Sequence, residues 1–198
     1  MIAGSDQLLV NGAPLLVIAA GGSTEAAATV FAATMLVRVP VFVFSGVAGS
    51  LLPNLARLNA AADHKRFART VRKVCLTFAA ATVAISALAG LLGPTAMGLL
   101  YGHDYTGMSA ADLALLGFAA GCYLACGTVS QALLALARAG VGAAAWATAA
   151  GIFVLVVSVS SGSELHRVAL GLAAAMAVNA FLLAIAFALR VRAGGTAG

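Results

Sequence analysis

Charged side chains are scarce in this sequence: only 9% of its 198 residues are Asp, Glu, Lys or Arg, whereas 63% are hydrophobic. Soluble domains are about half apolar and about a quarter charged. The mean hydropathy of +1.06 shows the same imbalance. A water-soluble chain of this size could not bury so much apolar surface, so the composition excludes a soluble domain. We therefore expect an all-α, polytopic integral membrane protein.

Residues that commonly act as catalytic groups or metal ligands are also few: the chain has three Cys, three His and six Asp plus Glu. Cys122 and Cys126 are four residues apart, but structural metal sites use closer pairs and further ligands. We predict that they and Cys75 are small buried residues. Asp104 and Asp112 have no evident partners. We therefore expect no metal, no cofactor, no disulfide and no enzymatic activity.

Uncharged runs divide the chain into segments long enough to cross the ~30 Å hydrocarbon core as helices. The sequence predicts six transmembrane spans, at about residues 7–22, 26–52, 74–98, 113–136, 141–161 and 168–189. The first residues, MIAGSDQLLV, lack the basic region of a cleavable signal peptide. Six spans in this length leave no room for a soluble domain, so residues 1–198 are expected to form a single membrane lobe.

Basic residues gather on one side of this six-span arrangement. They are Arg57, Lys65, Arg66, Arg69, Arg72, Lys73, Arg138, Arg190 and Arg192. The opposite loops carry Glu25, Asp104, Asp112 and Glu164, with Arg167 as their only base. Because Lys and Arg concentrate in cytoplasmic loops, both termini are predicted to lie in the cytoplasm. The basic loop is expected to attract anionic lipid headgroups, with docking of cytoplasmic enzymes as the alternative.

Neutral polar side chains inside the predicted spans can hydrogen-bond to neighbouring helices. They are Asn11, Thr128, Gln131 and Asn179. Asn11 precedes Pro14, and broken helices at membrane depth face protein or a wet cavity. Small residues spaced by four, Gly117 with Gly121 and Ala147 with Gly151, favour close approach of two helices.

The stretch AATMLVRVPVFVF, residues 32–44, places Arg38 near the middle of a long apolar span. At ~1.5 Å per residue it is roughly 18–21 Å from either span end, too far for its side chain to reach bulk water. Thr34 and Ser45 share its helical face, and Pro40 frees a backbone carbonyl nearby. We predict that this face lines a water-filled cavity or meets an anionic partner. The alternative is an ion pair between Arg38 and a carboxylate.

Several short motifs follow one another in a characteristic order. Arg-Val-Pro at 38–40 precedes Leu-Leu-Pro at 51–53 and a basic stretch, and GLLGPTAMGLLYGHDY at 90–105 and GTVSQALLALARAG at 127–140 come later. This order resembles the second half of a Wzx-type polysaccharide flippase, a member of the multidrug/oligosaccharidyl-lipid/polysaccharide exporter superfamily. The family has at least twelve helices, so the resemblance makes this chain a carboxy-terminal six-helix lobe and leaves the amino-terminal lobe missing.

The resemblance implies a cavity between two lobes, lined by the first two helices of each. Asn11, Arg38, Thr34 and Ser45 are therefore the candidate substrate-binding residues, and Arg38 would hold the pyrophosphate of a polyprenyl-linked oligosaccharide. The implied partners are this lipid-linked oligosaccharide, membrane lipids and either the missing lobe or a second copy in a homodimer, and no nucleic acid. The implied location is the bacterial inner membrane, in a multi-pass arrangement.

Other functions remain open at this point. A lipid II flippase belongs to the same superfamily. A cation-coupled drug exporter would favour a carboxylate buried within the lobe. A truncated or scaffold subunit would not transport at all. YGHDY, residues 101–105, is an interfacial aromatic segment, with His103 or Asp104 as a proton-coupling site in the alternative interpretation.

Overall fold

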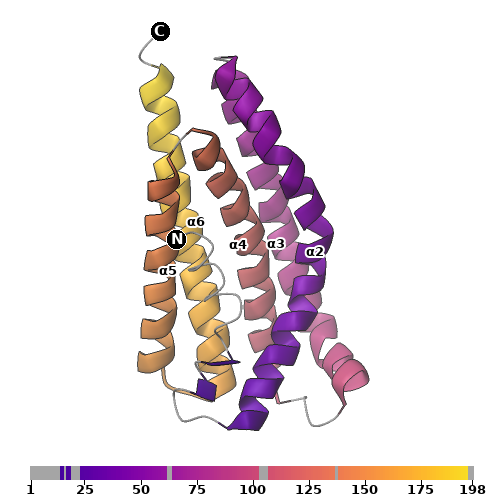
Figure 1. Cartoon of the computed structure of the whole chain (residues 1–198). Coiled ribbons are helices and arrows are strands. Elements are labelled where there is room, and N and C mark those ends of the chain that lie inside the picture. The colour runs from indigo at the N-terminus through magenta and orange to yellow at the C-terminus, as the bar shows by residue number, and fades with distance from the viewer. Residues whose placement is uncertain are drawn as a thin grey trace.

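The computed structural model describes residues 14–15, 17–18, 23–61, 64–102, 107–136 and 138–195 as helices and short connections (Figure 1). The labelled helices are α2 (Thr24–Ala60), α3 (His64–Tyr101), α4 (Ala110–Ala135), α5 (Ala139–Val159) and α6 (Glu164–Gly195). Most of the first predicted span, 7–22, lies outside the described residues. The all-helical prediction is confirmed for the described part of the chain.

Successive helices run in opposite directions along the bundle (Figure 1). The starts of α2, α4 and α6 lie at one end, and the starts of α3 and α5 lie at the other. The central helix is α4, which contacts α2, α3, α5 and α6. Its buried residues include Leu113, Leu116 and Leu133, and they pack with Phe153 of α5 in one hydrophobic core. Each connection is short, so neighbours in the sequence are antiparallel neighbours in space.

Four helices of the described part are long and apolar enough to cross a membrane: Arg66–Tyr101, Ala110–Ala135, Ala139–Val159 and Glu164–Leu189. They coincide with the last four predicted spans. The outward face of α3 is apolar, with Leu76, Val83, Leu91 and Leu99 largely exposed. In water such a face would be unstable, whereas lipid solvates it. The structure is therefore compatible with a multi-pass membrane protein.

The helices are longer than the predicted spans at the basic end of the bundle. The span prediction begins at 74, but α3 begins at His64, and α2 continues past 52 to Ala60. Charge-free runs mark only the part of a helix that lies in hydrocarbon. Lys and Arg are good helix formers, so the helical hydrogen bonding continues through the charged segments.

The predicted small-residue contact at Gly117 and Gly121 is confirmed. A Cβ added to Gly121 would lie 2.5 Å from the Thr82 Cα, and one added to Gly117 would lie 2.9 Å from the Ile85 carbonyl oxygen. Glycine is needed at both positions because α3 and α4 approach so closely. The same prediction is wrong for Ala147 and Gly151, since both are exposed and a Cβ at Gly151 would meet no described atom within 4 Å.

Candidate functional site

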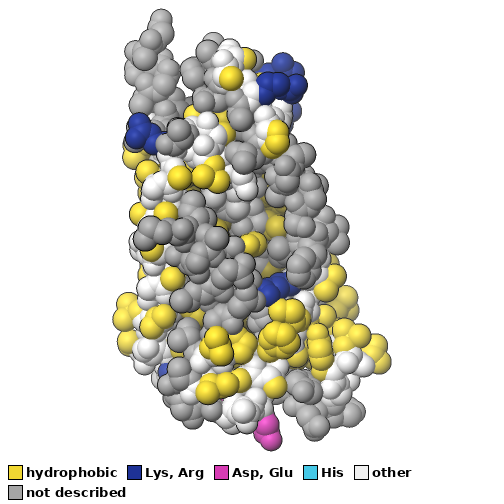
Figure 2. All heavy atoms as spheres, in the orientation of Figure 1, with side chains coloured by type: hydrophobic (Ala, Val, Ile, Leu, Met, Phe, Trp, Pro, Cys, Tyr) yellow, Lys and Arg dark blue, Asp and Glu magenta, His cyan; other side chains and the backbone are white. Residues whose placement is uncertain are grey.

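Apart from Arg38, the described charged side chains gather at the two ends of the bundle. Figure 2 shows Lys and Arg side chains near the end drawn at the top and an acidic side chain at the opposite end. The described basic residues of the first end are all exposed: Arg57, Arg66, Arg69, Arg72, Lys73 and Arg138. The described acids of the other end, Glu25, Asp112 and Glu164, lie in the first turns of α2, α4 and α6. This separation matches the one predicted from the loops.

Arg38 lies within the length of α2, away from both charged ends. It is half-buried, between the buried Val37 and the exposed Val39. Arg38 also interacts with other groups of the chain. A guanidinium group carries a permanent positive charge and five N–H donors. Side chains of α2 from 40 to 52, Pro40 and Ser45 among them, and all of Asn11 lie outside the described set.

Thr34 lies one helical turn before Arg38 and is buried. Its Oγ1 donates a hydrogen bond to the Val30 carbonyl oxygen at 2.7 Å. The hydroxyl proton is therefore used within the helix, and only the acceptor lone pairs of Oγ1 remain. An anionic ligand needs donors, so Thr34 could hold a phosphate only after giving up this bond.

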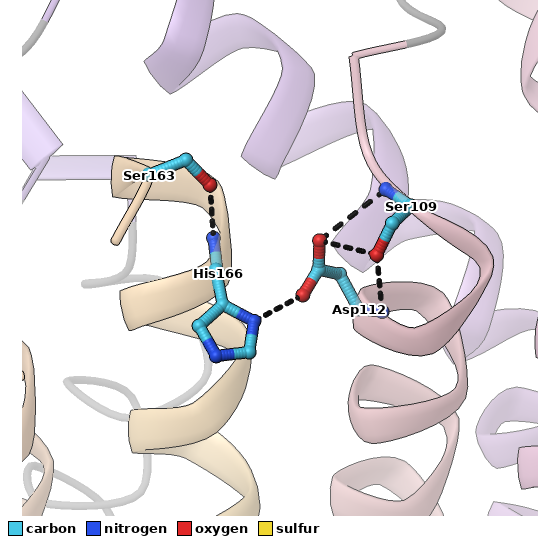
Figure 3. A network of polar contacts seen from close by, with 4 residues as sticks. All are labelled: Ser109, Asp112, Ser163 and His166. Atoms are coloured by element: carbon cyan, nitrogen blue, oxygen red, sulfur yellow. Dashed lines mark hydrogen bonds and ion pairs between the residues drawn. The ribbon is translucent and has the colours of Figure 1, made fainter. Parts of the chain in front are cut away.

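A polar cluster lies at the acidic end, where α4 and α6 begin (Figure 3). Ser109 is the N-cap of α4, and its Oγ accepts a hydrogen bond from the Asp112 N–H at 3.1 Å. In return, Asp112 Oδ2 accepts from the Ser109 N–H at 3.3 Å and from the Ser109 hydroxyl at 2.7 Å. This reciprocal capping box satisfies backbone donors that the start of a helix leaves unpaired.

The other carboxylate oxygen of Asp112 contacts α6. Its Oδ1 lies 2.7 Å from the His166 Nδ1, with the Asp112 side chain 7% exposed and the His166 side chain 43% exposed. Ser163 holds the start of α6 by accepting a hydrogen bond from the His166 N–H at 3.2 Å. The expectation that Asp112 lacks partners is therefore wrong. Ser-Ala-Ala-Asp before an apolar run is a capping-box pattern, and it was the signal available in the sequence.

The order of contacts in this cluster limits its chemistry. A serine nucleophile must hydrogen-bond to the imidazole that takes its proton, with the carboxylate on the far side of that imidazole. Here Ser109 and His166 contact opposite oxygens of one carboxylate, so His166 does not activate Ser109. The cluster joins the first turns of α4 and α6 through one carboxylate.

Arg167 is the one described base at the acidic end of the bundle. Its Nε donates to the Val157 carbonyl oxygen at 2.8 Å, and its Nη2 donates to the same oxygen. Val157 lies in the last turn of α5, where carbonyl groups lack helical partners. A cation at this position also complements the helix dipole. Arg167 therefore has a structural role that its place in the sequence did not indicate.

Asn179 of α6 is fully buried, and neither its Oδ1 nor its Nδ2 has a hydrogen-bond partner in the structure. The Oε1 of Gln131 is likewise buried without a partner. Thr128 donates to Leu124 of its own helix. The predicted interhelical hydrogen bonds of Thr128 and Asn179 are therefore absent from the described part of the chain. Each unpaired buried group is unfavourable by about 1–3 kcal/mol.

Comparisons of the chain with protein families, curated proteins and solved structures gave no match. In the part of the chain that the structure describes, no three His, Cys, Asp or Glu side chains are grouped as metal ligands would be. The flippase resemblance stays a prediction from the sequence.

Proposed function

We propose that this chain is the carboxy-terminal lobe of a transporter that flips polyprenyl-pyrophosphate-linked oligosaccharide across a bacterial inner membrane for polysaccharide biosynthesis. The observation that carries the proposal is the half-buried Arg38 within α2, remote from the charged ends of the bundle. Arginine at membrane depth is unfavourable by at least about 2.5 kcal/mol. Such a residue is retained where it has a function, and a pyrophosphate fits its permanent charge and planar donors.

The arrangement of helices and charges supports a multi-pass lobe with the orientation predicted from the loops. The basic end of the bundle would face the cytoplasm, and a span before α2 would make six. Each lobe of a two-lobed transporter related by an axis along the membrane normal has this even number of spans. A second lobe, or a second copy in parallel orientation, would cover the face of α2 that carries Arg38.

Binding of polyprenyl pyrophosphate tests the proposal without requiring the second lobe. The purified chain would be titrated with this lipid and examined by native mass spectrometry. Replacing Arg38 by Gln is expected to weaken binding about tenfold to a hundredfold, because charge-assisted hydrogen bonds are lost. Arg38→Lys is expected to retain part of the affinity through its point charge. Membrane abundance of Arg38→Gln should stay normal, since removing a buried charge does not hinder insertion.

Two outcomes would contradict this proposal. Unchanged affinity of Arg38→Gln for polyprenyl pyrophosphate would remove Arg38 from the site. A collapse in abundance of that variant would favour the ion-pair alternative, in which an orphaned carboxylate destabilises the protein by about 3–5 kcal/mol. A competition experiment with lipid II distinguishes the two candidate flippase substrates, because it shows which of the two lipids the purified chain binds more tightly. In proteoliposomes, flipping of a fluorescent lipid-linked oligosaccharide should require the second lobe or a dimer.

The contact between Asp112 and His166 favours one second candidate, a cation-coupled exporter of the same superfamily. Paired Asp and His side chains form proton relays in some pumps and transporters. If this function is correct, Asp112→Asn should abolish proton-driven drug efflux in inverted vesicles and leave polyprenyl pyrophosphate binding unchanged. Efflux that persists in Asp112→Asn would remove this candidate.

A further inference from the structure

The basic end of the bundle lacks the acidic residues that the other end uses to balance its helix termini. Glu25, Asp112 and Glu164 lie in the first turns of α2, α4 and α6, where a negative charge complements the positive end of the helix dipole. The first turns of α3 and α5 contain no acidic residue. Two positive helix ends therefore lie at the end where the exposed basic side chains gather.

Three of these basic side chains follow one another along the start of α3. Arg69, Arg72 and Lys73 are exposed, and Arg57 at the end of α2 and Arg138 before α5 are exposed at the same end of the bundle. Asp63 is outside the described residues. Of the groups that the structure describes at this end, none is an Asp or a Glu. Like charges repel, so an anion from outside the described bundle would stabilise this surface.

The start of α3 presents these charges on a fixed helix. Phe67 and Val71, on its opposite face, are buried, and the ring of Phe67 stacks on that of Phe187 of α6 with 6.1 Å between centroids. The basic turns are therefore held against the bundle by side-chain packing. Long side chains on a packed helix lose less freedom on binding than a mobile tail does.

The expected position of these basic turns relative to the bilayer indicates the class of anion that they would bind. Residues 74–101 of α3 are apolar, and at ~1.5 Å per residue they extend roughly 40 Å. That length crosses the ~30 Å hydrocarbon core and reaches the headgroup region. Arg72 and Lys73 come directly before this segment, and Arg69 is one turn earlier. In a membrane-spanning α3, these residues would lie at the level of the lipid phosphates.

We propose that Arg69, Arg72 and Lys73 form a binding site for the phosphate groups of anionic phospholipids, with Arg57 and Arg138 strengthening the local potential. Phosphate oxygens accept hydrogen bonds from the guanidinium and ammonium groups, and the lipid supplies the negative charge that α3 and α5 lack at their starts. The site requires a bundle that spans a bilayer and does not depend on transport of a glycan.

Native mass spectrometry of the full chain in neutral detergent, titrated with phosphatidylglycerol or phosphatidylcholine, tests this site. The unmodified protein is expected to prefer phosphatidylglycerol. The variant R69Q/R72Q/K73Q should lose this preference on the order of a hundredfold, since each basic residue near an anionic surface contributes about fivefold. R69K/R72K, which keeps the charge, should retain it, as should Glu25→Gln at the opposite end. Because the protein is purified, altered membrane orientation of the variants does not affect the measurement.

Equal preference for phosphatidylglycerol in R69Q/R72Q/K73Q and the unmodified protein would overturn the proposal. Displacement of phosphatidylglycerol by millimolar inorganic phosphate would show that the site binds soluble anions instead of lipid. If the triple variant does not fold, salt dependence tests the site instead. The preference of the unmodified protein for phosphatidylglycerol should decrease as NaCl is raised from 50 to 500 mM, because exposed charges are screened. A salt-independent preference would overturn the proposal. The Arg38→Gln variant should keep phosphatidylglycerol binding while losing polyprenyl pyrophosphate, so the two proposals fail separately.

Discussion

Asp112 and His166 are 54 residues apart in the chain, yet Asp112 Oδ1 lies 2.7 Å from His166 Nδ1. The contact joins the first turn of α4 to the first turn of α6, two helices that run in the same direction and are separated in sequence by α5. The carboxylate of Asp112 serves both helices at once: one oxygen caps α4 and the other contacts α6. Its removal should therefore have larger effects than the loss of a surface pair.

Asp112→Ala is expected to lower the free energy of unfolding by about 1–3 kcal/mol, because it removes the carboxylate that accepts from the Ser109 N–H and contacts His166. His166→Ala should lower it by less than about 1 kcal/mol, because the imidazole is partly exposed. Together the two substitutions should be less than additive, because residues in direct contact are energetically coupled. Thermal unfolding in nanodiscs measures all three variants. Asp112→Ala combined with Glu164→Ala serves as the control, and its effects should add. Additive effects for Asp112 and His166 would mean that their contact does not stabilise the fold.

Asn179→Leu is expected to raise the melting temperature. Both polar atoms of Asn179 are buried without partners, and an apolar residue with the same branching removes this penalty of about 1–3 kcal/mol per group. Leu183, one turn further along α6 and also fully buried, provides the matched control: Leu183→Asn should lower the melting temperature. A loss of stability in Asn179→Leu would show that the amide makes a hydrogen bond in the membrane that is absent here.

Gly121→Ala should weaken the packing of α3 on α4. The added methyl group would lie 2.5 Å from the Thr82 backbone, and the strain of overpacking is typically about 1–3 kcal/mol. Gly151→Ala is the matched control, because a methyl group there meets open space and alanine favours helix by about 1 kcal/mol. Thermal unfolding should show opposite shifts for the two variants. A stabilising Gly121→Ala would contradict the close approach of α3 and α4.

Cysteine labelling tests the proposed orientation. Gly107, Ser161 and Ala61 are exposed in the structure, so a cysteine at each position would be accessible from its own side of the membrane. In intact cells an impermeant maleimide should label Gly107→Cys and Ser161→Cys and miss Ala61→Cys. Permeabilised cells, in which all three should react, are the control. Labelling of Ala61→Cys in intact cells would contradict the proposed orientation and indicate the opposite one.

The sequence predicted the helical architecture well because hydrophobic runs and charge positions are properties of the chain itself. Gly117 and Gly121 were identified by spacing, and their contact with α3 exists. Gly151 has the same spacing from Ala147 but faces outward, because a four-residue repeat defines a helix face without defining what that face contacts. The same limit explains the wrong prediction for Asn179, whose partners depend on the neighbouring helices.

The contacts of Asp112 with His166 and of Arg167 with Val157 could not be predicted from local patterns. Both join residues of different helices, and both depend on how α6 lies beside α4 and α5. Only the capping box of Ser109 and Asp112 has a local signature, because its two members are three residues apart, and it was not predicted. The depth of Arg38 along its helix could be predicted from its position in the chain, and the structure adds that the side chain is half-buried.

The close fit of Gly117 and Gly121 against Ile85 and Thr82 has a mechanical consequence. With backbone so near to backbone, neither α3 nor α4 can turn about its own axis without a collision, and close-packed interiors transmit such strain instead of absorbing it. The hydrogen bond from Ser86 to the Ala114 carbonyl, at 2.8 Å, also resists sliding of one helix along the other. Any hinge in the described bundle is therefore expected outside the pair that α3 and α4 form, and these two helices should move as one rigid unit.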